Sequence, residues 1–231
     1  MAAHHVLTPS ATHSHTVIFL HGRDSTALEF AGEFFESQAS DDKTLQEIFP
    51  GFKWVFPASA TRNSARFGVK MSQWFDIWSL ENPEELKDIQ KAGLSESISS
   101  VIEVIEFEAS LIGTEKIILA GISQGCATAI HALLQGERRL GAFVGVCSWL
   151  PFQSEIHENE GSESNFALET PVLLAHSEDD DVVPIQNGER LSRGFIELGM
   201  SVEWHTYKLG GHWINEPQGI DDMVGFLKNS C

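Results

Sequence analysis

The sequence has few basic residues. Lys and Arg together number 15 against 33 Asp and Glu, which gives a formal charge of −18. A surface with this charge repels phosphate backbones and anionic lipid headgroups. The composition therefore argues against a nucleic-acid partner, and it disfavours stable residence on an acidic membrane surface.

Long apolar runs are missing. No stretch approaches the roughly 18 to 20 consecutive apolar residues that cross a bilayer. The segment Met1 to His15 lacks the basic start and the apolar run of a secretory signal. Motifs for myristoylation and prenylation are absent too. We therefore expect no stable membrane insertion.

Cysteine is rare, with only Cys126, Cys147 and Cys231. An odd number cannot all pair within one chain, so free thiols in a reducing compartment are the simpler interpretation. We predict a cytoplasmic location. The histidines between residues 4 and 15 stand without Cys or carboxylate ligands at fixed spacing, which favours a mobile N-terminal tail over 1–15 and no metal site. No cofactor is predicted.

Short apolar runs alternate with longer helical patterns through the rest of the chain. Six strands are predicted, at Thr16–Leu20, Lys53–Phe56, Lys116–Ala120, Ala142–Cys147, Pro171–Ala175 and Val202–Tyr207. Five helices are predicted between them, at Glu29–Gln38, Leu94–Leu111, Gln124–Leu134, Ile185–Leu198 and Ile220–Lys228. This alternation predicts one α/β domain over 16–231, with a mostly parallel sheet covered by helices on both faces.

Two longer segments fit neither pattern. Pro57 to Pro83 contains several aromatic residues, and Pro151 to Thr170 is polar and acidic. Long loops in compact domains are often lids or binding walls, and ordinary surface excursions are the alternative.

The strongest chemical signal is Gly121-Ile122-Ser123-Gln124-Gly125, which lies between a predicted strand and a predicted helix. This is the context of a nucleophile elbow, a tight turn that presents the serine hydroxyl. Side chains at 121 and 125 would collide with neighbouring chain in such a turn. Cys126 follows one turn into the helix and is interpreted as a buried packing thiol.

A serine needs a base that a third group orients, and in this fold the order is Ser, acid, His. The strand at Pro171–Ala175 leads into four adjacent acids, Glu178 to Asp181. The last strand leads into Gly210-Gly211-His212. Both loops follow strands, where parallel sheets place their sites, so His212 is predicted as the base. The backbone N–H groups of Gln124 and of Arg23, which follows the first strand, are the predicted oxyanion donors.

Seven segments in order resemble the acyl-protein thioesterase / small carboxylesterase family, also described as a phospholipase–carboxylesterase group. They are VIFLHGR at 17–23, FPASATR at 56–62, MSQWFDIWSL at 71–80, GISQGCA at 121–127, SWLP at 148–151, LLAHSEDDDVVP at 173–184 and GGHW at 210–213. The chain looks closest to fungal-type members.

The resemblance implies a single-domain α/β hydrolase with a minimal lid and a Ser–Asp–His triad. It places the acid on Asp180 and a substrate channel at Trp74 and Leu150. It also implies acyl esters or thioesters, of small molecules or acylated proteins, as substrates, and a homodimer in some members. The chain departs from the family at Arg23, where an apolar residue is usual, and at Cys126, where a glycine is usual.

The predicted function is hydrolysis of a carboxylic ester or thioester through acyl-Ser123. One alternative is a specialised esterase or lactone hydrolase for a small metabolite, which the altered oxyanion loop and the acidic residues at 153–163 suggest. Another is a binding module that kept the fold without the activity.

Overall fold

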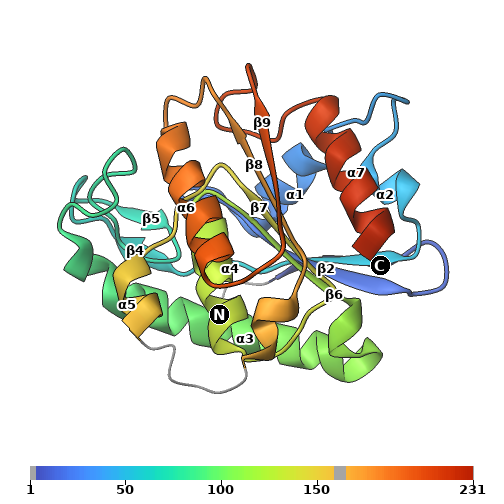
Figure 1. The fold of residues 1–231 in the computed structure, drawn as a ribbon, viewed down its shortest axis with the longest axis horizontal. Coiled ribbons are helices and arrows are strands. Elements are labelled where there is room, and N and C mark those ends of the chain that lie inside the picture. The colour runs from blue at the N-terminus through green and yellow to red at the C-terminus, as the bar shows by residue number, and fades with distance from the viewer. Residues whose placement is uncertain (1–3, 159–164, 231) are drawn as a thin grey trace.

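The structure is a computed structural model that describes residues 4–158 and 165–230. Its centre is a seven-stranded sheet in the order β1-β3-β2-β6-β7-β8-β9. β1 pairs with β3 in the antiparallel direction, and the other neighbours are parallel. The strands are β1 (His5–Leu7), β2 (His15–Leu20), β3 (Phe52–Phe56), β6 (Ile117–Ile122), β7 (Ala142–Val146), β8 (Val172–Ser177) and β9 (Val202–Tyr207). The predicted α/β-hydrolase sheet is confirmed (Figure 1).

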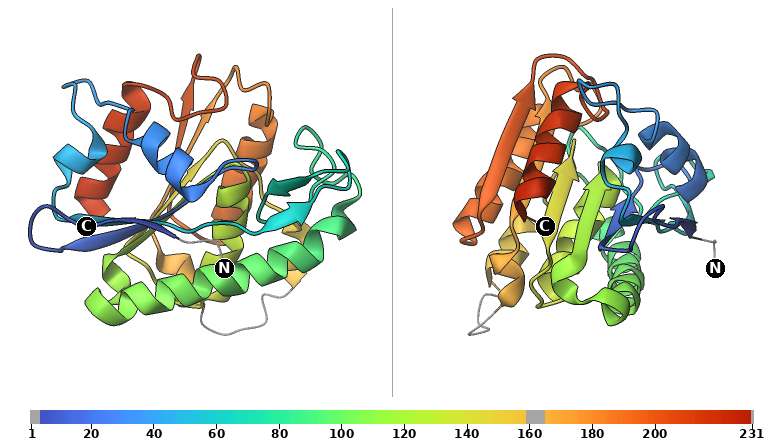
Figure 2. Two further views of the ribbon diagram at one scale, coloured as in Figure 1. Left: turned by 180° about the vertical axis from the view of Figure 1, so that it is seen from behind. Right: turned by 90° about the vertical axis from the view of Figure 1, so that its right-hand side faces the viewer.

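Helices cover both faces of this sheet (Figures 1 and 2). One apolar cluster joins the sheet to α3, α4 and α6, and a second joins it to α1, α2 and α7. The bounds are α1 (Ala27–Phe34), α2 (Leu45–Ile48), α3 (Lys91–Ile112), α4 (Gln124–Gln135), α5 (Gln153–Glu158), α6 (Ile185–Glu197) and α7 (Gln218–Ser230), with short 3₁₀ turns at η1 (Lys87–Gln90), η2 (Thr114–Lys116) and η3 (Phe166–Glu169). Because both faces are covered, the central strands consist almost wholly of buried residues, which explains their continuous apolar runs.

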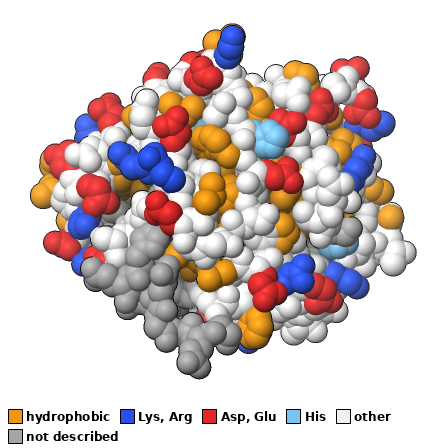
Figure 3. Space-filling view, in the orientation of Figure 1, with side chains coloured by type: hydrophobic (Ala, Val, Ile, Leu, Met, Phe, Trp, Pro, Cys, Tyr) orange, Lys and Arg blue, Asp and Glu red, His pale blue; other side chains and the backbone are white. Residues whose placement is uncertain are grey.

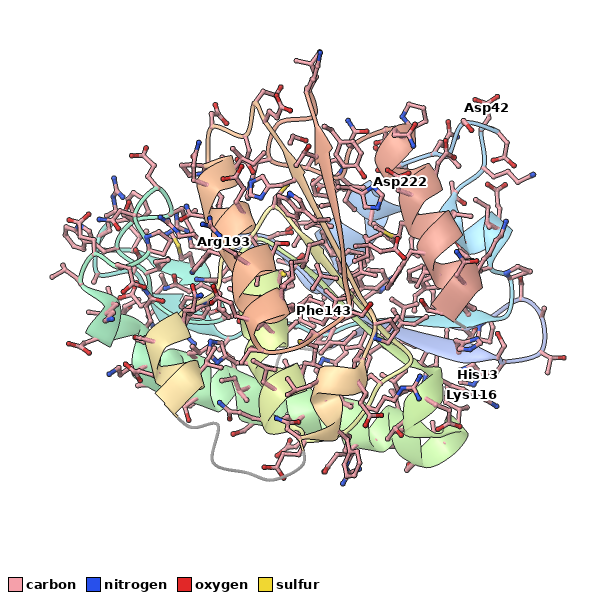
Figure 4. The ribbon with its side chains drawn as sticks, in the orientation of Figure 1. His13, Asp42, Lys116, Phe143, Arg193 and Asp222 are labelled. Carbon is pink, nitrogen blue, oxygen red and sulfur yellow. The ribbon has the colours of Figure 1, made fainter. Side chains whose placement is uncertain are left out.

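Individual contacts illustrate how the two layers attach. Phe143 of β7 meets Phe195 of α6 edge to face, with ring centroids 6.0 Å apart, and both are fully buried. On α7, Asp222 accepts a hydrogen bond from the Tyr207 hydroxyl of β9 at 2.9 Å. Figure 4 labels Phe143 near the middle of the sheet and Asp222 on α7.

The N-terminal segment differs from the predicted mobile tail over residues 1–15. His5–Leu7 form β1, which lies at the sheet edge with Val6 opposite Val55. Leu7 also packs against the second apolar cluster. The prediction was wrong for these residues because β1 pairs with a strand some fifty positions later, which local composition does not reveal. That 16–231 forms one domain stays a prediction.

The two unpatterned segments contain short elements. Residues 57–83 include the hairpin of β4 (Thr61–Asn63) and β5 (Lys70–Ser72). The segment 151–170 contains α5 and η3. The part of the predicted acidic segment 153–163 that falls on 159–163 lies outside the described residues. Within the described residues, no helix combines the length and apolar character needed to cross a membrane. Acidic and basic side chains are interspersed over the face in Figure 3.

The order of strands creates one switch point. From β2 the chain moves to β3 on one side, and β6 then pairs with β2 on the other, with Leu20 opposite Gly121. The loops after β2 and β6 therefore leave the sheet side by side, and open parallel sheets bind ligands at such points.

Candidate active site

Ser123 lies in a strained turn between β6 and α4. Its backbone has φ 53° and ψ −125°, a region that non-glycine residues rarely adopt and that costs on the order of 1–3 kcal/mol. Three hydrogen bonds hold the turn. Ser123 N–H donates to the Val146 carbonyl at 2.9 Å, and its own carbonyl accepts from Ala127 N–H at 3.0 Å and from the Ser148 hydroxyl at 2.8 Å. The geometry is that of a nucleophile elbow.

Gly121 and Gly125 of the motif lie where neighbouring backbone leaves no room for a side chain. A Cβ on Gly121 would contact the backbone of Cys126 at 2.5 Å, and a Cβ on Gly125 would overlap the carbonyl oxygens of Leu20 and His21. The start of α4 can therefore pack directly against the end of β2. Burial raises the pKa of the Cys126 thiol to about 12, so this thiol stays protonated and packs as an apolar group.

Asp180 follows β8, and its side chain is fully buried. One carboxylate oxygen, Oδ1, accepts from the backbone N–H groups of Val182 at 2.9 Å and Val183 at 2.8 Å. The other, Oδ2, lies 2.8 Å from Nδ1 of His212 and 3.1 Å from Nε2 of His176. The carboxylate is therefore fixed by main chain on one side and held between two imidazoles on the other.

This environment sets the charge of Asp180. Burial alone raises the pKa of the carboxyl, but hydrogen bonds from His176 and His212, the charge of His212 and the Val183 N–H lower it. The net pKa lies well below the ordinary value, so Asp180 is ionised at neutral pH. A carboxylate can only accept, so Nδ1 of His212 carries the proton of the 2.8 Å hydrogen bond. In the neutral imidazole this leaves Nε2 of His212 without a proton, which is the tautomer that a general base requires.

The neighbouring acids have separate positions. Oδ1 of Asp179 accepts from the N–H of Gly211 at 2.9 Å, which ties the β8 loop to the backbone just before His212. Asp181 is exposed. Of the acids after β8, Asp180 is the one that contacts the imidazole of His212.

Ser123 and His212 line the same cavity of about 400 Å³, so the structure brings Ser123, His212 and, behind the imidazole, Asp180 together. Within the described residues, the Ser123 hydroxyl forms no hydrogen bond to His212. Hydrogen bonds of this kind are often long until substrate binds. The cavity is also lined by Gly22, Arg23, Asp24, Ser25, Phe30, Glu33, Phe67, Met71, Leu80, Ile122, Val182 and Trp213.

The loop after β2 is held by His21. Its Nε2 accepts from Ser59 N–H at 3.2 Å, so the proton lies on Nδ1, which donates to the Gly22 carbonyl at 2.7 Å. This bond fixes the peptide between Gly22 and Arg23. The N–H of Arg23 donates to no backbone atom of the described residues, and Gln124 occupies the first turn of α4, where N–H groups lack intrahelical acceptors. Both predicted donors are therefore uncommitted.

Trp74 and Leu150 are buried and are not among the residues that line this cavity. The Trp74 indole donates to the His21 carbonyl at 2.8 Å, and its backbone N–H donates to the Gln124 side chain at 2.9 Å. Trp74 thus braces the β2 loop and the elbow helix from behind. A direct substrate contact by Trp74 or Leu150 stays a prediction from the resemblance.

Three supporting residues escaped sequence analysis: Ser148, His176 and the side chain of His21. Ser148 and His21 form hydrogen bonds with the main chain of segments distant in sequence, and His176 contacts Asp180 across the loop after β8. The sequence alone does not show how these segments and loops fold. The only local signal was that His176 directly follows a predicted strand, beside the acids.

Cys147, His176 and Asp180 offer atoms within 4.8 Å of one another, as a metal site would. Most of their possible ligand atoms are engaged in other contacts, and Nδ1 of His176 is the exception among the described residues. Both Asp180 oxygens accept hydrogen bonds, and Nε2 of His176 faces the Val183 carbonyl at 2.8 Å as well as Asp180. Burial raises the pKa of the Cys147 thiol well above its ordinary value, and the thiol lies 3.5 Å from the Trp213 carbonyl. We interpret the group as a hydrogen-bond network that supports Asp180.

Comparison with known proteins shows the family of this chain. Residues 1–231 match the phospholipase/carboxylesterase family. The chain belongs to this family. It is 32% identical over 239 aligned positions to acyl-protein thioesterase 1 of Cryptococcus neoformans, with 97% of this chain and 95% of that protein covered. It is 30% identical to acyl-protein thioesterase 1 of Yarrowia lipolytica, with 95% and 93% covered.

Solved structures support the fold. The crystal structure of Zea mays acyl-protein thioesterase 2 superposes with a TM-score of 0.83 at 24% identity, and the match covers 100% of this chain and 99% of that one. The predicted family and α/β-hydrolase fold are confirmed, and this member of the phospholipase/carboxylesterase family is a serine hydrolase.

Proposed function

We propose that this family member hydrolyses carboxylic esters and thioesters through an acyl-Ser123 intermediate. The observation that carries the proposal is the 2.8 Å contact between His212 Nδ1 and Asp180 Oδ2, behind an imidazole that lines the same cavity as Ser123. A protonated Nδ1 leaves Nε2 free to take the serine proton, and the buried carboxylate stabilises the imidazolium that forms.

The reaction has two halves. Ser123 Oγ attacks the carbonyl carbon while His212 takes its proton, and the N–H groups of Arg23 and Gln124 donate to the oxyanion. Collapse of the tetrahedral intermediate breaks the bond to the leaving oxygen or sulfur, which receives the proton from His212. Water then attacks the acyl-serine with His212 as base, and a second collapse releases the carboxylic acid and restores Ser123.

The substrate class draws on the relatives and the cavity. The relatives named above are acyl-protein thioesterases, which supports an acyl thioester or ester, of a protein or a small molecule, as substrate. Phe67, Met71 and Leu80 give the cavity an apolar wall suited to an acyl chain. Cys126 and Cys147 are free thiols, which supports the predicted cytoplasmic location. A homodimer stays a prediction.

The test is a Ser123→Ala variant with a chain-length series of 4-nitrophenyl esters and matched acyl thioesters. We expect turnover of every substrate to fall by at least about 10³-fold, because the nucleophile is removed. Ser99→Ala, at an exposed serine of α3, is the matched control and should keep full activity. Undiminished turnover by the Ser123 variant would overturn the proposal. A steep preference for long acyl thioesters supports the acyl-protein substrate, and a preference for acetyl groups contradicts it.

A further inference from the structure

The cavity beside Ser123 is lined by a cation, the guanidinium of Arg23, one of whose donors has no hydrogen-bond partner among the described residues. Arg23 lines it, and its guanidinium carbon lies 5.4 Å from the ring centroid of Phe67, another lining residue. The guanidinium is therefore at the Phe67 wall of the cavity. Its Nη1 is buried and has no hydrogen-bond partner among the described residues. A buried donor left unpaired costs on the order of 1–3 kcal/mol, and more when it is charged.

Two other arginines each donate a hydrogen bond to a protein acceptor. Arg66 also contacts the Phe67 ring, but its Nη1 donates to the Trp78 carbonyl at 2.8 Å. Arg62 pairs with Glu96 at 2.7 Å. Arg62 also has a buried Nε without a partner among the described residues. Arg23 differs from Arg62 and Arg66 because it lines the cavity that contains Ser123.

Two carboxylates and one cation act on this guanidinium. Burial and the charge of Arg66 lower the pKa of Arg23, and Asp24 and Asp76 raise it. Asp76 accepts from Ala65 N–H at 3.0 Å. Asp24 and Glu33 also line the cavity, but both are exposed, so water screens them. Water therefore screens the guanidinium of Arg23, which is only partly exposed, less than it screens the carboxylates of Asp24 and Glu33.

We propose that Arg23 binds a carboxylate on the substrate, so that the preferred substrate is an ester or thioester with a negative charge near its scissile bond. This inference rests on the proposed hydrolase function. A guanidinium offers paired donors that match the two oxygens of a carboxylate, and such charge-assisted bonds are strong in a partly desolvated site. The carboxylate would bind the part of the Arg23 side chain that lines the cavity, with Phe67 packed against the guanidinium.

The test compares matched pairs of substrates. On the acyl side, mono-4-nitrophenyl adipate is compared with 4-nitrophenyl hexanoate, which has the same carbon number and no charge. On the leaving-group side, the hexanoate ester of 4-hydroxybenzoate is compared with that of 4-hydroxybenzamide. In each pair the readout is the ratio of kcat/KM for the charged substrate to that for the neutral one. If a substitution at Arg23 disturbs the oxyanion loop, it lowers kcat/KM for both substrates of a pair, so this effect cancels in the ratio.

We expect the unaltered chain to prefer the charged member of at least one pair. Arg23→Leu should lower that ratio by roughly 10- to 100-fold, the range expected when a charge-assisted hydrogen bond is lost. Arg23→Lys should keep part of the preference, because lysine retains the positive charge but lacks the paired N–H donors of the guanidinium. The matched control is Arg139→Leu, which makes the same change of charge at an exposed position outside the cavity, and it should leave the ratio unchanged.

Two outcomes would overturn the inference: no preference for a charged substrate in either pair, or a preference that Arg23→Leu leaves intact. Labelling of Ser123 by a neutral fluorophosphonate separates these from failure of the hydrolase proposal. A chain that labels at Ser123 but ignores substrate charge is a hydrolase in which Arg23 binds no anion. If Arg23→Leu does not fold, the ratio is read in Arg23→Lys and Arg23→Gln, and an undiminished ratio in Arg23→Gln refutes the inference.

Discussion

Replacing Asp180 by Asn tests the part of the site that the structure defines most sharply. The side-chain oxygen of Asn can still accept from the N–H groups of Val182 and Val183. Its amide nitrogen, however, replaces Oδ2 and faces the N–H groups of His212 and His176, so donors oppose donors. His212 can relieve this only by moving its proton to Nε2, which removes the base.

The expected loss follows from that tautomer. A triad whose histidine is held in the wrong tautomer loses roughly 10⁴ in kcat, so we expect Asp180→Asn to lose about 10³- to 10⁴-fold, or about 4 to 5.5 kcal/mol of transition-state stabilisation. The assay is hydrolysis of 4-nitrophenyl butyrate, with the circular dichroism spectrum as a check on folding.

Asp181→Asn and Asp179→Asn are the matched controls, because each removes one charge from the same loop. Asp181 is exposed, so its variant should stay within about twofold of the unaltered chain, as surface changes generally do. Asp179 holds only the backbone of Gly211, and its variant should lose far less than Asp180→Asn. A folded Asp180→Asn protein with more than a tenth of the original activity, or an equal loss in Asp181→Asn, would refute the reasoning.

Two further predictions concern stability. Gly125→Ala should lower the free energy of unfolding by more than about 2 kcal/mol, because its Cβ would overlap the backbone at the end of β2. Gly225 has open space around it, so Gly225→Ala should lower the free energy of unfolding by less than about 0.5 kcal/mol. Urea titration measures both values, and equal losses would contradict this prediction. Burial lowers the pKa of His131 to about 4, so the unfolded chain binds a proton that the folded chain refuses, and stability should fall between pH 6.5 and pH 4 by up to about 3 kcal/mol. His131→Gln should lose less over that window, and an unchanged pH slope would count against it.

The central strands and the elbow could be predicted because their signals are local. A buried parallel strand needs an uninterrupted apolar run, and the elbow needs small residues around its serine. The predicted strand Lys116–Ala120 therefore overlaps β6 (Ile117–Ile122), and Ser123 follows it as expected. The predicted strand Val202–Tyr207 matches β9 residue for residue. Helix ends shifted by a few residues, as at α1, which begins at Ala27 after the Thr26 cap.

The remaining features depend on contacts between distant residues. β1 depends on pairing with β3, where Val6 lies opposite Val55. Spacing alone does not distinguish Asp180 from the adjacent acids, whereas the family resemblance does. The two hydrogen bonds of the His21 ring, from the Ser59 N–H and to the Gly22 carbonyl, depend on the path of a long loop. The unpaired Nη1 of Arg23 likewise follows from packing on Phe67. Motifs can locate such residues, but their partners come only from the fold.

The most direct measurement of the central claim is the position of a covalent adduct. The protein is treated with a fluorophosphonate, digested and mapped by mass spectrometry, alongside the His212→Ala variant. We expect one adduct per chain, on Ser123, with labelling slowed by at least about 10³-fold when the base is removed. An adduct on another residue, or labelling of Ser123 at the same rate without His212, would contradict it.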